Sequence, residues 1–145
     1  MKIAMLTNNY KPFIGGVPIS IERLAEGLRN LGHQVTVFAP EGAGCKEEPG
    51  VVRYRVLYEQ RDKGLVIGNF IDKRIEKEFR DGQFDVIHVH HPVVIGFTAV
   101  YLSKKYGIPL AYTYHTRYEE YLHYFKLYER MTAGREPVRN AARFS

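Results

Sequence analysis

Apolar and polar positions alternate along the chain in blocks whose lengths suit strands and helices in turn. Five runs rich in Val, Ile and Tyr have the length of strands, and they are Lys2–Thr7, Gln34–Ala39, Val51–Tyr58, Phe84–His90 and Leu110–His115. Three stretches repeat apolar residues at helical spacing, and they are Val17–Leu31, Val66–Arg80 and Val94–Tyr106. This alternation of nearly continuous apolar strands with helices predicts an α/β fold, a doubly wound parallel sheet covered by helices on both faces.

The first two helical stretches have an apolar stripe that is expected to face the sheet, and glycines mark the ends of all three. In the first stretch the stripe is Ile19, Ile21, Leu24, Leu28 and Leu31. In the second it is Ile67, Phe70, Ile71, Ile75 and Phe79. The tail after Tyr118 is helical in pattern and rich in aromatic residues, which favours a packing face.

The segments that follow three of the predicted strands carry the residues of chemical interest. Ligands of doubly wound sheets bind outside the carboxyl ends of the strands. The segments there are Asn8–Gly16, His88–Pro92 and His115–Tyr118. We therefore expect a site along this edge of the sheet.

Two glycines, Gly15 and Gly16, stand where the first helix begins. A helix N-terminus offers free amides, and glycine lets a phosphate approach the backbone, so a diphosphate site is one interpretation. A plain strand-to-helix turn is the other. Neither the dinucleotide fingerprint GxGxxG nor the phosphate loop GxxxxGK[ST] is present, which disfavours nicotinamide-dinucleotide and ATPase functions.

Histidines gather at the end of the fourth strand, where the two-residue period places His88 and His90 on one face and His91 follows. No acidic residue within the motif completes a metal site, so a structural or substrate-facing role is favoured and no metal is expected. His115 ends the fifth strand, and Thr116 with Glu119 has the spacing of a capping box for a following helix. His115 either binds a substrate oxygen at the mouth of the cleft or is a buried residue of the helix entry.

Composition narrows these alternatives. The chain has 145 residues, which suits one domain, and its net charge of +5 suits phosphates or lipid head groups. No arginine-rich tract or nucleic-acid motif accompanies the charge, so no nucleic-acid partner is expected. The single cysteine, Cys45, and the lack of a signal-peptide core predict a cytoplasmic protein whose membrane contact, if it has one, is peripheral at the inner face.

Several of these motifs together resemble the N-terminal domain of family-four glycosyltransferases of the GT-B fold. The matching segments are Lys2–Thr7 followed by Pro12 and Gly15–Val17, the connector Gly32–Val35, the run Phe84–His90 and the step Tyr114–Thr116. The stretch His115–Tyr121 is most similar to that of bacterial diacylglycerol glucosyltransferases. The resemblance implies a Rossmann-like, acceptor-binding half of a retaining hexosyltransferase, spanning 1–145 and cut before the domain that binds the donor.

The resemblance also implies roles for particular residues. Gly15 and Gly16 would meet the donor phosphates or the acceptor, and His115 would contact the transferring sugar as the catalytic residue. His90, His91, Arg117 and Tyr118 would bind the acceptor. The implied partners are a nucleotide-sugar donor, expected to be a UDP-sugar, and a lipid or other hydroxyl acceptor, with no cofactor. The paired glutamates of the family's C-terminal domain do not occur in these residues, so the chain alone is expected to be inactive.

Basic residues accompany the second helical stretch, and they are Lys73, Arg74, Lys77 and Arg80. They form either a contact with an anionic membrane surface or an ordinary solvated face. Two other functions stay open from sequence alone. One is another Rossmann-like enzyme, such as a sugar-nucleotide epimerase or an oxidoreductase, and the other is a non-catalytic ligand- or membrane-binding module.

Overall fold

A computed structural model describes residues 1–42, 44–60, 65–68 and 72–115. Its main sheet has five parallel strands in the order β3-β2-β1-β6-β7. These strands are β1 (Lys2–Leu6), β2 (Gln34–Pro40), β3 (Val51–Tyr54), β6 (Val86–Val89) and β7 (Leu110–Tyr112). The predicted α/β class and parallel sheet are confirmed.

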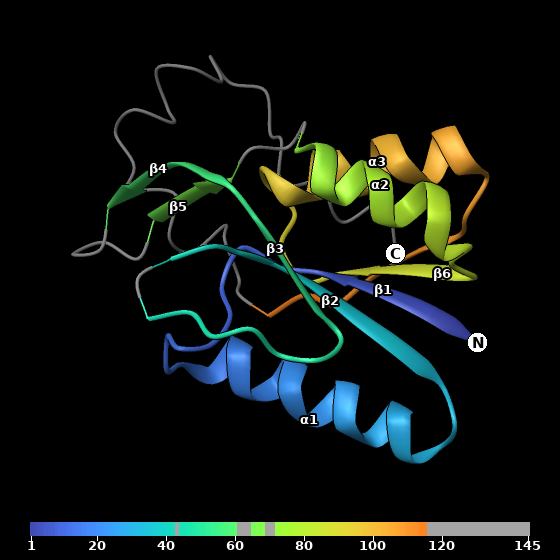
Figure 1. The fold of residues 1–145 in the computed structure, drawn as a ribbon, viewed down its shortest axis with the longest axis horizontal. Helices are drawn as coiled ribbons and strands as arrows, with labels where there is room; N and C mark the ends of the chain where they lie inside the picture. Colours follow the sequence, from blue (N-terminus) through green and yellow to red (C-terminus); the bar gives the residue numbers. More distant parts are fainter. Residues whose placement is uncertain (43, 61–64, 69–71, 116–145) are drawn as a thin grey trace.

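Helices cover both faces of this sheet (Figure 1). Helix α1 (Gly16–Asn30) lies on one face, and α2 (Lys73–Gly82) and α3 (Ile95–Tyr106) lie side by side on the other. The strand order changes direction at β1: β2 and β3 lie on one side of it, and β6 and β7 lie on the other. Ligands of doubly wound sheets bind in the crevice beside such a switch point, so the loops that follow β1 and β6 are where a site is expected.

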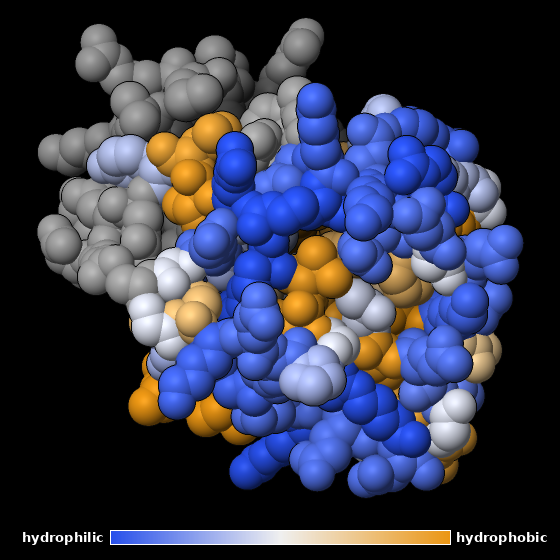
Figure 2. All heavy atoms as spheres, in the orientation of Figure 1, coloured by the Kyte–Doolittle hydropathy of each residue, from blue (hydrophilic) through white to orange (hydrophobic). Residues whose placement is uncertain are grey.

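Each face of the sheet has its own apolar core. The core under α2 and α3 includes an aromatic group in which Phe79 lies 5.2 Å from Phe38 and 4.9 Å from Phe84, measured between ring centroids. The core under α1 is smaller and contains Met5 and Ile21, both fully buried. Figure 2 shows hydrophilic side chains over most of the visible face, with apolar atoms exposed in the hollow between the helix layers.

Two predicted elements differ from the structure. The run Val51–Tyr58 divides into β3 and β4 (Val56–Gln60), and β4 pairs antiparallel with β5 (Leu65–Gly68) in a separate two-stranded sheet. The predicted helix Val66–Arg80 is therefore wrong in its first part, because β5 occupies that sequence and α2 begins only at Lys73. A short apolar run cannot be assigned to helix or strand by periodicity alone.

The stripe predicted for α1 is also partly wrong. Pro18, Ile21 and Ala25 are its buried residues, whereas Ile19 is 42% exposed and Leu24 is 37% exposed. Small residues fit close to the sheet, so hydrophobicity alone misplaced the inner face. Within the described residues, no helix has both the length and the apolar character needed to cross a membrane.

Candidate functional site

The junction between β1 and α1 lies at this switch point. Thr7 is fully buried, its hydroxyl donates to the carbonyl of Asn9 at 2.8 Å, and its own carbonyl accepts from the Tyr54 hydroxyl at 2.7 Å. These bonds hold the chain as it leaves β1. Helix α1 then begins with no side chain capping its N-terminus and no acidic residue in its first turn. Its first amides and the positive end of its dipole thus stay available to an anion.

The two glycines at this junction are not equivalent. A Cβ at Gly15 would lie 2.9 Å from the ring of Phe13, so a side chain there requires that ring to move. A Cβ at Gly16 would meet nothing within 4 Å. Gly15 has φ −172° and ψ 169°, an extended conformation open to any residue. The fold itself therefore has no need of glycine at position 16.

The loop after β6 lies beside this junction, and His91 joins the two segments. The backbone N–H of Asn8 donates to Nδ1 of His91 at 3.2 Å, so this nitrogen is the unprotonated one. The Asn8 side-chain amide donates to the carbonyl of Val93 at 3.1 Å. His91 is 8% exposed, and burial, with a smaller effect of the His115 charge, lowers its pKa to about 4. A neutral His91 with its proton on Nε2 thus joins the loops of β1 and β6.

Helix α3 begins close against the same loop. A Cβ at Gly96 would lie 2.8 Å from the carbonyl oxygen of His91, a contact that real side chains do not make. Val94, which precedes the helix, has φ 62° and ψ −86°, where a β-branched residue is strained. Tight packing therefore determines the path of the chain from His91 to α3.

Three imidazoles form a row across β6 and the end of β7. The ring centroids of His88 and His90 are 4.3 Å apart, which confirms that the two side chains share a face. His90 Nδ1 lies 2.9 Å from Nε2 of His115, with the rings stacked at 5.1 Å. At the other end of the row, His88 Nε2 lies 2.6 Å from the hydroxyl of Thr113. We call His88, His90 and His115 the histidine row.

The electrostatics of the histidine row favour neutral rings. Burial, together with the charges of the neighbouring histidines, lowers the pKa of His90 to about 2. Burial also lowers the pKa of His88 and of His115 below the usual value for histidine. All three are therefore uncharged near neutral pH, so the histidine row adds no positive charge to the site.

The sequence-predicted site residues have different accessibility. His115 is half-buried, whereas His90 is 1% exposed, so direct contact between His90 and an acceptor is not available in this conformation. Arg117 and Tyr118 lie outside the described residues. In the part of the chain that the structure describes, no group of three His, Cys, Asp or Glu residues is placed to hold a metal ion. The metal-free assignment stays a prediction.

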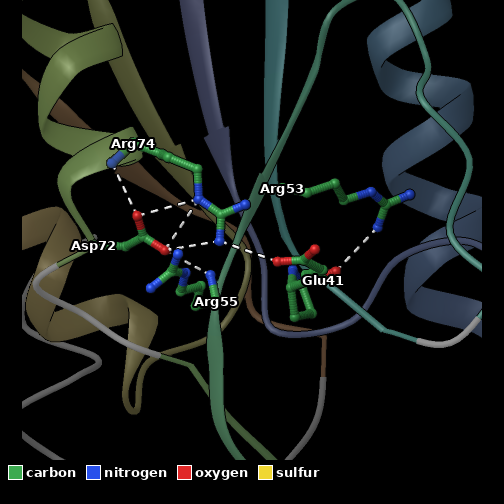
Figure 3. Close-up of polar contacts among 6 residues, drawn as sticks. Glu41, Arg53, Arg55, Asp72 and Arg74 are labelled. Atoms are coloured by element: carbon green, nitrogen blue, oxygen red, sulfur yellow. Dashed lines mark hydrogen bonds and ion pairs between the residues drawn. The ribbon is translucent and has the colours of Figure 1, made fainter.

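Of the four basic residues predicted to contact a membrane, Arg74 is engaged within the protein (Figure 3). Its guanidinium donates to Asp72 at 3.0 Å and to Glu41 at 3.1 Å. Asp72 also accepts from the backbone N–H of Arg55 at 2.6 Å and of Arg74 at 2.8 Å, which makes it the N-cap of α2. Arg80 pairs with Asp81 on the exposed surface at 3.0 Å.

Sequence reasoning missed several of these residues. Asp72 carried a signal that could have been used, because an aspartate before a basic, apolar-periodic run is a typical N-cap. Asn8, Thr7 and Thr113 carried no signal beyond their position at strand ends. Their partners lie far along the chain, as with Asn8 and His91, which are 83 positions apart.

Comparison with known proteins identifies the family of this fold and site. A family model described as Glycosyltransferase Family 4 matches residues 14–145. The chain belongs to glycosyltransferase family 4. The resemblance deduced from the sequence motifs is thereby confirmed.

Among similar proteins of known function, two carry the same description. The family 4 chain is 37% identical over 128 residues to the alpha-monoglucosyldiacylglycerol synthase of Acholeplasma laidlawii, covering 86% of the chain and 32% of that protein. It is 30% identical over 135 residues to the synthase of that name in Streptococcus pneumoniae, with 86% and 29% covered. A phosphatidyl-myo-inositol mannosyltransferase of Mycolicibacterium smegmatis is 31% identical over 120 residues, with 80% and 31% covered. The family 4 chain thus spans about a third of the length of these relatives.

A solved structure supports the fold assignment. The sucrose-phosphate synthase of Thermosynechococcus elongatus superposes with a TM-score of 0.58 at 17% sequence identity, covering 79% of the family 4 chain and 33% of that protein. At this identity the likeness concerns the fold alone. It agrees with a Rossmann-like half of the GT-B architecture.

Proposed function

We propose that this chain is the acceptor-binding part of a retaining hexosyltransferase that moves a sugar from a UDP-sugar to the hydroxyl of a diacylglycerol-type lipid. Family membership supports sugar transfer, and the descriptions of two relatives support the lipid acceptor. The proposal rests chiefly on the ends of β1 and β6. There the N-terminus of α1 has no side-chain cap, and the loop after β6 is joined to the loop after β1 by the hydrogen bond from Asn8 to His91.

The residues of this candidate site take separate roles in the proposal. The amides at Gly15 and Gly16 meet the donor phosphates, where the helix dipole favours negative charge. His115 contacts the transferring sugar near the reacting carbon as a neutral hydrogen-bonding group. We assign acceptor binding to His91, Arg117 and Tyr118. Because the chain spans about a third of the length of its relatives, we assign most of the donor-nucleotide contacts to a second domain.

Transfer assays with the two-domain protein test this proposal. UDP-glucose and dispersed diacylglycerol should give a glucolipid with retained anomeric configuration, and chelation of metal ions should leave the rate unchanged. His115→Ala should lower kcat by about 100-fold or more, the usual size of a lost transition-state contact. His33→Ala is the matched control, since His33 lies by the chain's amino-terminus, away from the candidate site. A His115→Ala rate equal to that of the control would remove His115 from the site.

Gly16 provides a second test of the same site. Because a Cβ there meets nothing within 4 Å, Gly16→Val should leave the thermal midpoint of the fold nearly unchanged. It should nevertheless raise the KM for the UDP-sugar and lower kcat, since the side chain would stand where a phosphate must approach. Unfolding of Gly16→Val, with normal activity per folded molecule, would instead show that Gly16 serves the turn alone.

The transferase proposal also separates this chain from a stand-alone binding module. Without the second domain the 145 residues should fold but transfer no sugar, because the donor nucleotide then lacks most of its contacts. Turnover by the chain alone, above that of its His115→Ala variant, would refute the division of roles between the two domains.

We further propose that the α2 face meets an anionic membrane, since a lipid acceptor has to be taken from a bilayer. Lys73, Lys77 and Arg80 recur at helical spacing on the side of α2 opposite the buried Ile75 and Phe79. Lys73 and Lys77 are exposed and have no ion pair among the described residues. Each such cation near an anionic surface contributes about 1 kcal/mol.

The neighbouring helix supports this membrane contact. Helices α2 and α3 are joined by the ion pair of Glu76 with Lys105, and α3 exposes Phe97 and Tyr101 one turn apart, 69% and 53% accessible. An aromatic stripe beside a basic one is suited to the interface between head groups and acyl chains.

Vesicle co-sedimentation tests the membrane proposal. Binding should occur with vesicles containing phosphatidylglycerol and not with pure phosphatidylcholine, and salt should weaken it. Lys73→Glu with Lys77→Glu should abolish binding, whereas Arg23→Glu with Lys46→Glu, an equal change of charge outside α2, should retain most of it. Equal loss in both variants would show that net charge, not the α2 face, drives the binding.

A further inference from the structure

His115 has only one ring nitrogen left for a ligand. Nε2 of His115 is occupied, because it lies 2.9 Å from Nδ1 of His90. Two imidazole nitrogens at this distance share one hydrogen, so one ring donates and the other accepts. The direction of this bond decides the tautomer of His115 and thus the chemistry that it can offer.

The surroundings of His90 indicate the direction of the bond. Its other nitrogen, Nε2, is buried and has no hydrogen-bond partner among the described residues. A hydrogen on Nε2 would be a buried donor without an acceptor, which folded proteins seldom tolerate. A hydrogen on Nδ1 is satisfied by His115 and leaves only a lone pair unpaired at Nε2. Burial lowers the pKa of His90 to about 2, so the ring does not carry both hydrogens near neutral pH.

The rest of the histidine row holds His90 in this orientation. The His88 ring packs against it at 4.3 Å, and His88 is itself bonded to Thr113 at 2.6 Å. With 1% of its surface exposed, His90 has no room to turn toward water. The ring is therefore a fixed donor aimed at His115.

We infer that His90 is a positioning residue whose Nδ1–H donates to Nε2 of His115, leaving Nδ1–H of His115 as the one group of that ring that can meet a substrate. The inference rests on the proposed function only for the identity of the substrate. It assigns His115 the role of a hydrogen-bond donor to an oxygen, such as a sugar hydroxyl or a phosphate oxygen. It also excludes His115 as a general base, since neither ring nitrogen then has a free lone pair.

His90 acts on the reaction through His115 and not by contact with the sugar acceptor. A buried residue that orients another side chain affects the rate through its partner. At metal sites, loss of a residue that orients a metal ligand lowers metal affinity or activity by about 10- to 100-fold, and we expect an effect of similar size here. Asparagine can keep the essential contact, because its side-chain amide can place an N–H near the position of Nδ1. Leucine fills similar space and donates nothing.

The experiment is a long-range proton–nitrogen correlation spectrum of the protein labelled with nitrogen-15 histidine, recorded near neutral pH. His115→Gln and His90→Asn identify the signals of the two rings. We expect both rings to carry hydrogen on Nδ1 and none on Nε2. His90→Leu should convert His115 to a mixture of tautomers, whereas His90→Asn should preserve its Nδ1–H form. His33→Leu, at the opposite edge of the sheet, should leave the His115 signals unchanged.

Kinetics of the two-domain protein supply the second measurement. His90→Leu should lower kcat by about 10-fold or more with little change in the KM for the donor, and His90→Asn should recover most of the rate. A His115 protonated on Nε2 in the unaltered protein would overturn the inference, and so would a tautomer that does not respond to His90→Leu. If His90→Leu does not fold, the spectra of the unaltered protein and of His90→Asn still decide the tautomer. Absence of sugar transfer with the expected tautomer would refute the proposed function and leave the inference intact.

Discussion

Replacing Asp72 with alanine is expected to destabilise the fold by about 3 kcal/mol, from three losses that the structure separates. The N-cap of α2 accounts for about 1 kcal/mol. The N–H of Arg55, which donates to Asp72 at 2.6 Å, loses its acceptor, and a part-buried donor left unpaired costs about 1–2 kcal/mol. The ion pair with Arg74 adds about 0.5 kcal/mol, because the side chain of Arg74 is 39% exposed while that of Asp72 is 5% exposed.

The pH dependence of this loss provides an independent check. Burial alone would raise the pKa of Asp72, but the hydrogen bonds from Arg74 and from the backbone of Arg55 outweigh it and hold the pKa below its usual value. The contribution of the carboxylate is therefore fully present above the unfolded pKa of about 4 and is lost as the pH falls through the lower, folded pKa. The stability difference between Asp72→Asn and the unaltered chain should shrink in that acidic range.

Urea denaturation followed by far-ultraviolet circular dichroism measures both effects. Asp81→Ala is the matched control, since Asp81 belongs to the same helix but pairs with Arg80 on the exposed surface, and it should change the free energy of unfolding far less than Asp72→Ala does. If Asp72→Ala and Asp81→Ala prove equally mild, Asp72 does not organise the start of α2 and the geometry of Figure 3 is not that of the folded protein in solution.

Three further predictions concern packing and protonation. Gly96→Ala should destabilise the fold by about 1–3 kcal/mol, because its Cβ would lie 2.8 Å from a backbone oxygen. Gly27→Ala, on the open face of α1, should instead stabilise it by about 0.5–1 kcal/mol. Chemical denaturation measures both variants, and equal effects would refute the close contact at Gly96. Gln83→Gly should stabilise by about 1 kcal/mol, since Gln83 ends α2 with φ 50°, and a lower thermal midpoint would contradict this. The free energy of unfolding should fall as the pH drops from about 6.5 to about 4, because in this range His91 is protonated only in the unfolded chain, its folded pKa being about 4. His91→Asn should reduce the slope of the free energy of unfolding against pH by up to about 1.4 kcal/mol per pH unit. An unaltered slope would show that His91 is not the group responsible.

The sequence predicted the parts of the fold that depend on local pattern. The positions of β1, β2, β6 and β7, the parallel main sheet and helix α3 follow from periodicity and from the glycines that end helices. The start of α2 was misplaced because Ile67 of β5 was counted in its apolar stripe, whereas the cap at Asp72 marks the true beginning. The inner face of α1 was misplaced because the smaller Pro18 and Ala25 are buried against the sheet, whereas the larger Leu24 is exposed.

The candidate site was predictable only as a set of loop positions. The strand period placed His88 and His90 on one face, since that relation is local. The bond of His90 to His115 depends on β6 and β7 lying side by side, and the bond of Asn8 to His91 depends on β1 pairing with β6. Neither distance can be obtained from residue spacing, because each is created by the register of strands far apart in the sequence.

The pairing of β1 with β6 has a consequence for the order of assembly. Residues 83 positions apart meet there, as Asn8 and His91 do, so this pairing must wait for a long stretch of chain. During synthesis β1, α1 and β2 emerge first, and until β6 arrives β1 is an edge strand with unpaired amides and carbonyls. A nascent chain stopped before β6 would thus expose the unpaired edge of β1 and would lack the hydrogen bond between Asn8 and His91. Arrival of β6 covers the open edge of β1 and, in the same event, brings the loops of the candidate site together.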